Sequence, residues 1–426
     1  MLESGLTSAS KGSLSSLQVF ARVILVYVLG VLGAMTVSEA VPALEGIARE
    51  LHPSSPALIG LVMSLPGVVT AIGALMAGFL VDRFGDKPLL ATGAVITVAG
   101  DCIVAFAFSV AAVLIGRIVA GVGYVLVSVS AVTLLIRITS GKQRTWGLAL
   151  WSTFVPVSFI LPLLAAGLIA QLGWRFAFAG HAGIFLIMLL VGVAVLPSPE
   201  KQAGSREAGS SHTAGLKAVL RTPWVYLLGI SFGADAFMHN GVIATLGPYL
   251  HARYGANAIA VDQWNVGSMV IEATGSLLLG RLLTLEYSPK KILIAAILIL
   301  AVPGLTLFTC GIGTVASLAC SWTLMFGSGL LTAMWCYVPV VAPSPQSIGA
   351  TSGLVTQFTL FGVLLSGPIW YSALASPSRY AMATVMFFAI VFMCFRWPIV
   401  WQNKTPQHLA FQKAKAVRAV AEETVN

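Results

Sequence analysis

The chain has 426 residues, of which 58% are hydrophobic and only 9% are charged, and its formal net charge is +9. A soluble domain typically has about 25% charged residues, so the charged groups here are too few to cover a soluble surface. The composition therefore indicates an integral membrane protein. The positive charge does not indicate nucleic-acid binding, because the basic residues flank the apolar runs.

Twelve apolar runs follow a serine-rich segment that has no apolar stretch of its own and is therefore not a cleaved signal peptide. Each run is close to the roughly 20 residues that a helix needs to cross a bilayer. The runs are too long and continuous for barrel strands. We predict an all-α membrane protein with twelve spans at residues 20–43, 57–80, 88–109, 112–136, 146–171, 176–196, 224–248, 260–284, 290–311, 313–339, 349–372 and 378–402.

The loops between these spans differ in their content of lysine and arginine. Most of these residues fall on one side, and the other side holds Arg49, Arg175, Arg253 and Arg379. Because positive loop residues stay in the cytoplasm, both termini are predicted to be cytoplasmic, in a bacterial inner membrane.

A polar stretch at residues 197–223 divides the spans six and six and is, by composition, a flexible cytoplasmic linker. We predict a cytoplasmic tail at 1–19, one six-helix bundle at 20–196 and a second at 224–402. The basic segment 403–426 is expected to be a short helix on the cytoplasmic surface. The halves echo each other weakly, because Gly280 corresponds to Gly78, although Thr284 stands where Asp82 would match.

The turn between the second and third spans reads Gly78-Phe-Leu-Val-Asp82-Arg83-Phe-Gly85-Asp86-Lys87-Pro88. Gly85 can take a backbone angle that other residues avoid, and Pro88 suits the first turn of the next helix. Asp82, Arg83 and Lys87 are expected to form an ion cluster at the membrane surface.

This pattern resembles the signature loop of the major facilitator superfamily of secondary transporters. The resemblance covers nearly the whole chain and implies two six-helix bundles around a central substrate cavity. It implies that Asp82 reaches the N-terminus of the eleventh helix and closes the cytoplasmic side, with Arg83 as its partner. Asp86 stands where the family usually has a base, which predicts a weaker contact.

Arg117 lies within the fourth span, where an ionisable group is costly and calls for a function. Its surroundings, Gly116-Arg117-Ile-Val-Ala-Gly121-Val-Gly123, resemble a family motif in which this arginine faces the first helix and is linked to proton transfer. At 1.5 Å per residue, Arg117, Asp101 and Glu39 lie at similar depths, roughly 9–14 Å below the outer turn. We predict that Arg117 pairs with Asp101 or Glu39, and that the carboxylate it leaves, expected to be Glu39, carries the proton.

Helix seven carries Asp235 and His239 on one face, because they are four residues apart. Asn240 follows, and Glu272 on helix eight lies at a similar level. Two carboxylates with no matched base would tend to share a proton, which suits proton coupling or cation recognition. His181 and Arg396 are expected to be peripheral or structural, because helices six and twelve are usually outside the cavity. Tyr27, Tyr124 and Trp335 are weaker candidates for lining a substrate cavity.

Signals for enzyme chemistry are missing from the chain. It has no phosphate loop and no H-E-x-x-H, and its five cysteines form no C-x-x-C pair. We therefore expect no enzyme activity, no cofactor and no bound metal. The expected partners are a small-molecule substrate, protons and the lipid bilayer, with no nucleic acid, and the protein is expected to be a monomer.

The resulting hypothesis is a secondary active transporter of a small organic solute, coupled to protons and working by alternating access. Four intramembrane acids against two arginines favour export of an amphiphilic neutral or cationic compound. The fifth helix has Trp151-Ser-Thr-Phe-Val-Pro156 in place of the G-x-x-x-G-P pattern of antiporters, which weakens that interpretation. The alternatives are a proton-coupled importer of a small organic acid, and a membrane sensor of the same fold that binds without transporting.

Overall fold

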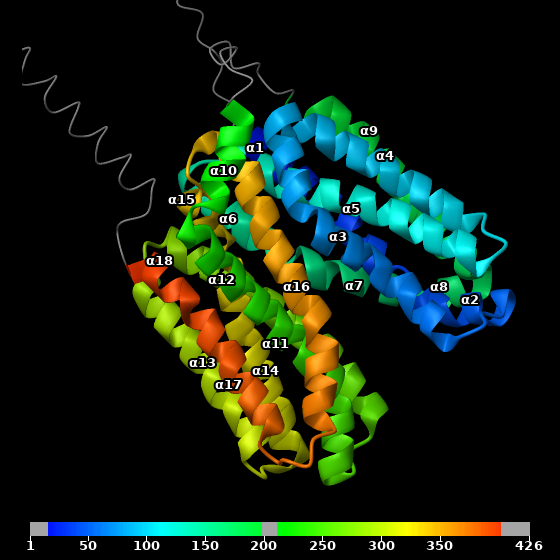
Figure 1. The fold of residues 1–426 in the computed structure, drawn as a ribbon, viewed down its shortest axis with the longest axis vertical. Coiled ribbons are helices and arrows are strands. Elements are labelled where there is room, and N and C mark those ends of the chain that lie inside the picture. Colours follow the sequence, from blue (N-terminus) through cyan, green and yellow to red (C-terminus); the bar gives the residue numbers. More distant parts are fainter. Residues whose placement is uncertain (1–15, 198–210, 402–426) are drawn as a thin grey trace, which may run out of the picture.

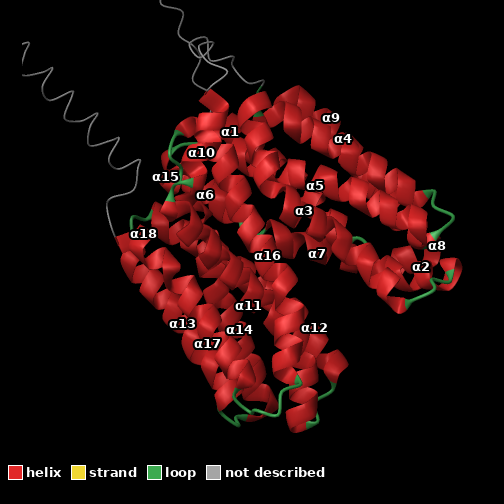
Figure 2. Cartoon of the chain, in the orientation of Figure 1, coloured by secondary structure: helices red, strands yellow, loops and turns green. Residues whose placement is uncertain are grey.

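The computed structural model describes residues 16–197 and 211–401. Within these residues every element is a helix and none is a strand (Figure 2). The predicted surface helix at 403–426 and most of the tail at 1–19 lie outside the described residues. The all-α prediction is confirmed.

The N-terminal bundle is formed by the elements before residue 197. They are α1 (Ser16–Ser38), η1 (Val41–Ala43), α2 (Leu44–Leu51), α3 (Pro56–Phe84), α4 (Asp86–Ala105), α5 (Val110–Ile138), α6 (Gly141–Trp151), α7 (Phe154–Leu164), α8 (Ala166–Leu172) and α9 (Trp174–Val195). Helix α5 packs against α1, α3 and α4, and α9 packs against α4 (Figure 1). In the most apolar window of α5, 83% of the residues are buried, so this helix is central.

The C-terminal bundle follows a short helix, α10 (Ser211–Leu220). Its elements are α11 (Pro223–Tyr254), α12 (Ala258–Thr284), α13 (Pro289–Thr309), α14 (Gly313–Thr332), η2 (Ala333–Tyr337), α15 (Val338–Val341), η3 (Pro345–Ser347), α16 (Ile348–Leu374), α17 (Ala381–Met393), η4 (Cys394–Arg396) and α18 (Trp397–Trp401). Helix α11 packs against α16 and α17, and α14 packs against α12 and α13.

Ten of the described helical segments are long and apolar enough to cross a membrane. The pair α6 and α7, bent by 40°, supplies an eleventh. Helix α11, with 32 residues, is long enough to be the twelfth, although it carries Asp235 and His239. Twelve spans are therefore consistent with the described chain.

The fifth span is not the continuous helix that was predicted at 146–171. It breaks after Trp151 and again near Ala165, giving α6, α7 and α8. The first break lies just before Pro156, which has no N–H to bond to the carbonyl four residues earlier. At the break, the hydroxyls of Ser152 and Thr153 donate to the Leu148 and Leu150 carbonyls of the preceding turn, at 2.9 and 2.8 Å.

Part of the predicted linker is helical rather than flexible. Helix α10 occupies residues 211–220 and packs against α3, α16 and η3. Val219 is fully buried there, and burial of an apolar side chain stabilises the helix against the two bundles.

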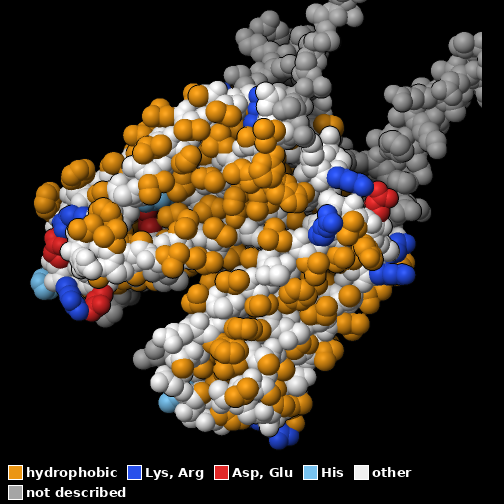
Figure 3. Space-filling model, turned by 180° about the vertical axis from the view of Figure 1, so that it is seen from behind, with side chains coloured by type: hydrophobic (Ala, Val, Ile, Leu, Met, Phe, Trp, Pro, Cys, Tyr) orange, Lys and Arg blue, Asp and Glu red, His pale blue; other side chains and the backbone are white. Residues whose placement is uncertain are grey.

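The two bundles meet at one end and separate toward the other, so the molecule has the outline of a V (Figure 1). The meeting end is where α1 starts and α18 ends. There α3 crosses α16, and α6 crosses α12. Seen from behind, a cleft separates the bundles at the opposite end (Figure 3).

Candidate functional site

A buried ionic cluster lies inside the N-terminal bundle. Arg117 on α5 is fully buried, and its Nη1 lies 2.7 Å from Glu39 Oε1. Its Nε donates to the Val62 carbonyl at 2.8 Å, and its Nη2 donates to the Thr36 carbonyl. The guanidinium also lies over the Phe178 ring, 5.3 Å from its centroid. All three nitrogens therefore have protein partners.

The structure shows which of the two predicted carboxylates, Glu39 or Asp101, lies closer to Arg117. Asp101 Oδ1 is 3.9 Å from Arg117 Nη1, so Glu39 is the closer partner and Asp101 the more distant one. This is the reverse of the expected ranking, in which Glu39 was left by the arginine. Glu39 directly follows the end of α1, the helix whose Thr36 carbonyl also accepts a hydrogen bond from Arg117.

His181 belongs to this cluster, which corrects the expectation that it is peripheral. Its side chain on α9 is buried, and Nδ1 lies 2.8 Å from Asp101 Oδ2 and 2.7 Å from Glu39 Oε2. Its Nε2 lies 2.9 Å from the Leu32 carbonyl on α1. Helix α9 is at the edge of the bundle, but a polar ring facing lipid would be costly, so it turns inward.

Glu39, Asp101 and His181 also have the chemistry of a metal site, with ligand atoms within 4.8 Å of one another. Arg117 already places a positive charge at this position, and a metal ion would have to sit beside it. The arrangement therefore suits a proton better than a divalent ion.

A second buried cluster lies in the C-terminal bundle around Asp235 on α11. Its Oδ1 accepts a hydrogen bond from Ser328 at 2.9 Å, and its Oδ2 accepts one from Thr332 at 3.1 Å. Arg396 Nη2 lies 3.4 Å from the same Oδ2, and both side chains are buried. Asp235 therefore has a matched base, contrary to prediction, and Arg396 is not peripheral.

Arg396 is held by the backbone and side chain of Ser231, one turn before Asp235 on α11. Its Nη2 donates to the Ser231 carbonyl at 3.1 Å, its Nε donates to the Ser231 hydroxyl, and its Nη1 donates to the Leu331 carbonyl. The guanidinium lies 4.6 Å from the Phe232 ring centroid. This arginine thus joins η4, α11 and α14.

His239 and Asn240, the other predicted residues of helix seven, differ in whether they contact another helix. His239 Nδ1 lies 3.1 Å from Glu272 Oε2, and the His239 side chain is 19% exposed, more than Glu272 at 8%. Asn240 Nδ2 donates to the Ala236 carbonyl of its own helix at 2.9 Å. His239 and Glu272 are therefore brought together, whereas Asn240 has no partner on another helix among those described.

The charged residues where α3 ends and α4 begins form the contact that closes the meeting end. Asp82 accepts the backbone N–H groups of Gly349 and Ala350, at the start of α16, at 2.8 and 2.7 Å. These are unpaired donors of a helix N-terminus, which favours a negative charge. Arg137 bonds to both Asp82, at 2.8 Å, and Asp86.

The structure corrects the partners within this turn. Arg137 on α5, rather than Arg83, is the base that pairs with Asp82. Arg83 lies against the Phe84 ring, and Lys87 donates to the Val193 and Leu196 carbonyls at 2.8 and 2.7 Å.

Close backbone packing supports this contact on both sides of the meeting end. A Cβ on Gly78 would lie 2.2 Å from the Gly349 carbonyl oxygen, and one on Gly280 would lie 2.3 Å from Ala149 Cβ. Gly85 has φ of 95°, as its predicted role in the turn requires. Only glycine lets α3 and α16 approach this closely.

The predicted aromatic residues lie within the bundles. Tyr27 bonds through its hydroxyl to Thr153 Oγ1 at 2.7 Å, at the break between α6 and α7. Tyr124 is buried on α5, and Trp335 packs against Phe232 with ring centroids 5.2 Å apart. Tyr27 thus contacts the break in the fifth span, and Trp335 lies in η2, the 3-10 segment between α14 and α15.

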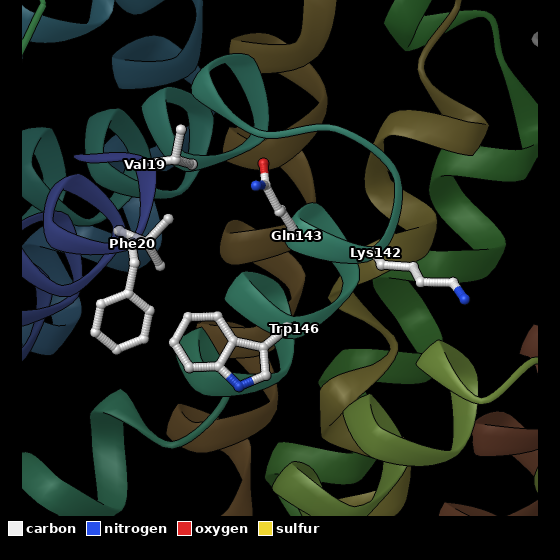
Figure 4. A pocket seen from close by; sticks show the side chains of 6 residues that line it. Val19, Phe20, Lys142, Gln143 and Trp146 are labelled. Carbon is white, nitrogen blue, oxygen red and sulfur yellow. The ribbon is translucent and has the colours of Figure 1, made fainter. Parts of the chain in front are cut away.

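A separate groove of about 260 Å³ lies between α1 and α6, near the meeting end (Figure 4). Phe20 and Trp146 stack there with centroids 5.3 Å apart, and Lys142 is also among the lining residues. None of the lining residues belongs to either ionic cluster, so the groove is not part of this site. Lys142 also forms an exposed ion pair with Glu286 at 3.1 Å, across the two bundles.

Comparison with known proteins finds one matching family model and several proteins of similar sequence. A family model described as Major Facilitator Superfamily matches residues 23–368. Multidrug resistance protein 1 of Bacillus subtilis is 23% identical over 378 residues, or 87% of this chain and 92% of that protein. The inner membrane transport protein YajR of Escherichia coli is 29% identical over 198 residues, or 45% of this chain and 41% of YajR. Methylenomycin A resistance protein of B. subtilis is 28% identical over 189 residues, or 42% of this chain and 39% of that protein. The chain thus matches less than half the length of the last two relatives.

Solved structures resemble the whole described fold. The proton:xylose symporter XylE superposes with a TM-score of 0.76 at 16% identity, covering 94% of this chain and 100% of that chain. The transporter FucP, solved in the outward conformation, superposes with a TM-score of 0.73 at 15% identity, covering 90% and 100%. At these identities the likeness concerns the fold alone.

Proposed function

Because the chain belongs to the major facilitator superfamily, we propose that it is a proton-coupled secondary transporter that moves a small organic solute by alternating access. The two bundles, residues 20–196 and 224–402, rock against each other around a central cavity. The protein is a monomer in a bacterial inner membrane, with both termini in the cytoplasm.

The observation that carries this proposal is the buried cluster of Glu39, Asp101, Arg117 and His181. With a neutral histidine, two carboxylates and one arginine leave one unbalanced negative charge in a fully buried place. Such a charge is costly in a membrane interior, and one bound proton removes it. The cluster is therefore suited to bind and release a single proton.

The closed meeting end supports assignment to an outward-facing state. Asp82 holds the start of α16, and the cleft opens at the far end (Figure 3). Since most lysine and arginine residues flank the meeting end, that end is cytoplasmic and the cleft faces outward. The likeness to FucP in its outward conformation agrees with this orientation.

Export of an amphiphilic neutral or cationic compound is the direction that we favour. Two relatives are named for drug or antibiotic resistance. The nitrogens of Arg117 are all engaged with protein oxygens, so this arginine is not available to a substrate carboxylate. Glu272, beside the partly exposed His239, is a carboxylate that a cationic solute could approach.

Import of a small organic solute with protons is the second candidate. It is favoured by the fold likeness to proteins titled proton:xylose symporter and fucose:proton symporter. The small organic acid that the sequence suggested fits less well, because Arg117 is fully engaged. A sensor of the same fold that binds without transport is the third.

The test uses the purified protein in proteoliposomes with an acidic interior and external ethidium, a flat monovalent organic cation. We expect ethidium to accumulate inside, and the rate to fall at least 10-fold in Glu39→Gln. The matched control is Glu45→Gln, since Glu45 is an exposed glutamate of α2 whose ion pair in the described part of the chain is with Arg49, four residues later. Full gradient-driven accumulation in Glu39→Gln would remove Glu39 from the coupling site.

The alternatives give different results in the same vesicles. Uptake of lactate driven by external acid, with no ethidium accumulation, would support import of an organic acid. Saturable binding of ethidium with no accumulation under any gradient would support the sensor.

A further inference from the structure

The hydrogen bonds of His181 determine how many protons its cluster holds. Nε2 lies 2.9 Å from the Leu32 carbonyl oxygen, which can only accept a hydrogen bond. Nε2 must therefore carry a hydrogen. The state of the ring then depends on Nδ1 alone.

Nδ1 faces two carboxylate oxygens, Glu39 Oε2 at 2.7 Å and Asp101 Oδ2 at 2.8 Å. If Nδ1 had no hydrogen, its lone pair would face both carboxylate oxygens at hydrogen-bond distance with no hydrogen between them. This is unfavourable in a buried site, so one hydrogen must lie in this triangle. Imidazole nitrogen accepts protons more readily than a carboxylate, and two carboxylates surround it.

We propose that His181 is the residue that carries the coupled proton, at Nδ1, and that this structure represents the proton-loaded N-terminal bundle. The inference rests on the proposed function and deepens it by naming the carrier. The groups that face His181 are Glu39 after α1, Asp101 on α4 and Arg117 on α5, within reach of those carboxylates. When the His181 ring is an imidazolium, its charge and the charge of Arg117 balance the charges of the two carboxylates.

Release of this proton has a structural consequence. The three facing acceptors would repel one another, and Glu39 would separate from Asp101 and His181. Glu39 follows the last residue of α1, and Leu32, which bonds to His181, lies on the same helix. Ser38 also bonds to the Ser158 carbonyl of α7 at 2.7 Å. Deprotonation would therefore displace the outer end of α1 together with α7.

The first test reads the ring directly and needs no substrate. Protein labelled with ¹⁵N-histidine in lipid nanodiscs is compared with His181→Gln, and the signal that disappears belongs to His181. If this variant does not fold, Asp101→Asn should shift the same signal and identify it. We expect both ring nitrogens to carry hydrogen at pH 7.5. A neutral ring with an unprotonated Nδ1 at that pH would overturn the proposal.

The second test separates a proton carrier from a structural residue. In His181→Gln we expect ethidium accumulation under a proton gradient to fall at least 10-fold, while ethidium counterflow without a gradient stays within 2-fold. The control is His251→Gln, because His251 is an exposed histidine near the far end of α11. Equal loss of both activities, or no loss of either, would contradict the assignment.

These results distinguish the two proposals. If wild-type protein shows no proton-driven transport, the proposed function fails, whatever the state of the ring. If transport is proton-driven but Nδ1 is unprotonated, only the role of His181 fails.

Discussion

Asp82 and Gly349 are 267 residues apart in the chain, yet the carboxylate of one accepts the backbone N–H of the other at 2.8 Å. Gly349 leaves room for this contact, because a Cβ there would lie 2.6 Å from Asp82 Oδ1. The two residues belong to different bundles. Their bond therefore stabilises only those states in which the meeting end is closed.

Replacing Asp82 by Asn should open the meeting end. The amide keeps one acceptor but loses the charge that favours the helix N-terminus, which should cost the closed state about 1–2 kcal/mol. The population ratio of closed to open states should fall about 5- to 30-fold. Spin labels at Gln143 and Gln346, in a cysteine-free protein, would measure this as a longer distance distribution.

The control for Asp82→Asn is Glu286→Gln, which removes another ion pair between the bundles. Lys142 and Glu286 are exposed, so water already screens their attraction. The distance distribution should stay as in the wild type. If Glu286→Gln opened the end as much as Asp82→Asn, general charge loss would explain both results.

Replacing Gly78 by Ala should also prevent close approach of α3 and α16. The added methyl group would lie 2.2 Å from the Gly349 carbonyl oxygen, which is backbone and cannot turn away. Overpacking of this kind typically costs about 1–3 kcal/mol. The same spin labels should report a shift toward open states.

Gly67→Ala on the same helix is the matched control, because beyond the adjacent residues and the nearby backbone of α3 no atom lies within 4 Å of the position of its Cβ. It should leave the distance distribution unchanged and favour the helix by about 0.5–1 kcal/mol. A closed end that persisted in Gly78→Ala would show that the helices can cross without glycine.

Replacing Arg396 by Gln should destabilise the C-terminal bundle. Asp235 would then be a buried carboxylate without its base, which typically costs about 3–5 kcal/mol. The thermal unfolding midpoint, followed by reaction of a thiol dye with the cysteines, should fall well below that of the wild type. Arg379→Gln, at an exposed arginine, is the control.

The double variant Arg396→Gln with Asp235→Asn gives the decisive comparison for this pair. Removing both charges should recover part of the lost stability, because neither partner is left buried alone. Strictly additive losses would mean that the two side chains do not interact.

The sequence was sufficient for the all-α membrane fold, the contact of Asp82 with the eleventh span and the grouping of Arg117 with Glu39 and Asp101. Each of these depends on helix length, depth or a local motif. It was not sufficient for His181 and Arg396, which were placed outside the cavity, or for Arg137, which follows directly after the span predicted at 112–136. Their roles depend on which way a helix is rotated, and this is set by packing.

One signal could have identified two of the missed residues. His181 and Arg396 each lie inside an apolar span, and an ionisable side chain there needs a buried partner wherever its helix sits in the bundle. In each half of the chain, the predicted intramembrane acids outnumber the intramembrane arginines. This excess indicated that an acid there needed a further partner. The break of the fifth span was less predictable, since Pro156 allows a kink without requiring it.

Gly78 lies near one end of α3, so a rotation of the helix about this point displaces its other end the most. About 22 residues separate it from the start of the helix, which at 1.5 Å per residue is an arm of roughly 33 Å. A tilt of only ~10° about the crossing with α16 would carry the far tip by roughly 6 Å, about the length of one helical turn. A small change in the angle at which α3 crosses α16 near Gly78 therefore moves the far end of α3 by a distance comparable to the width of a small molecule.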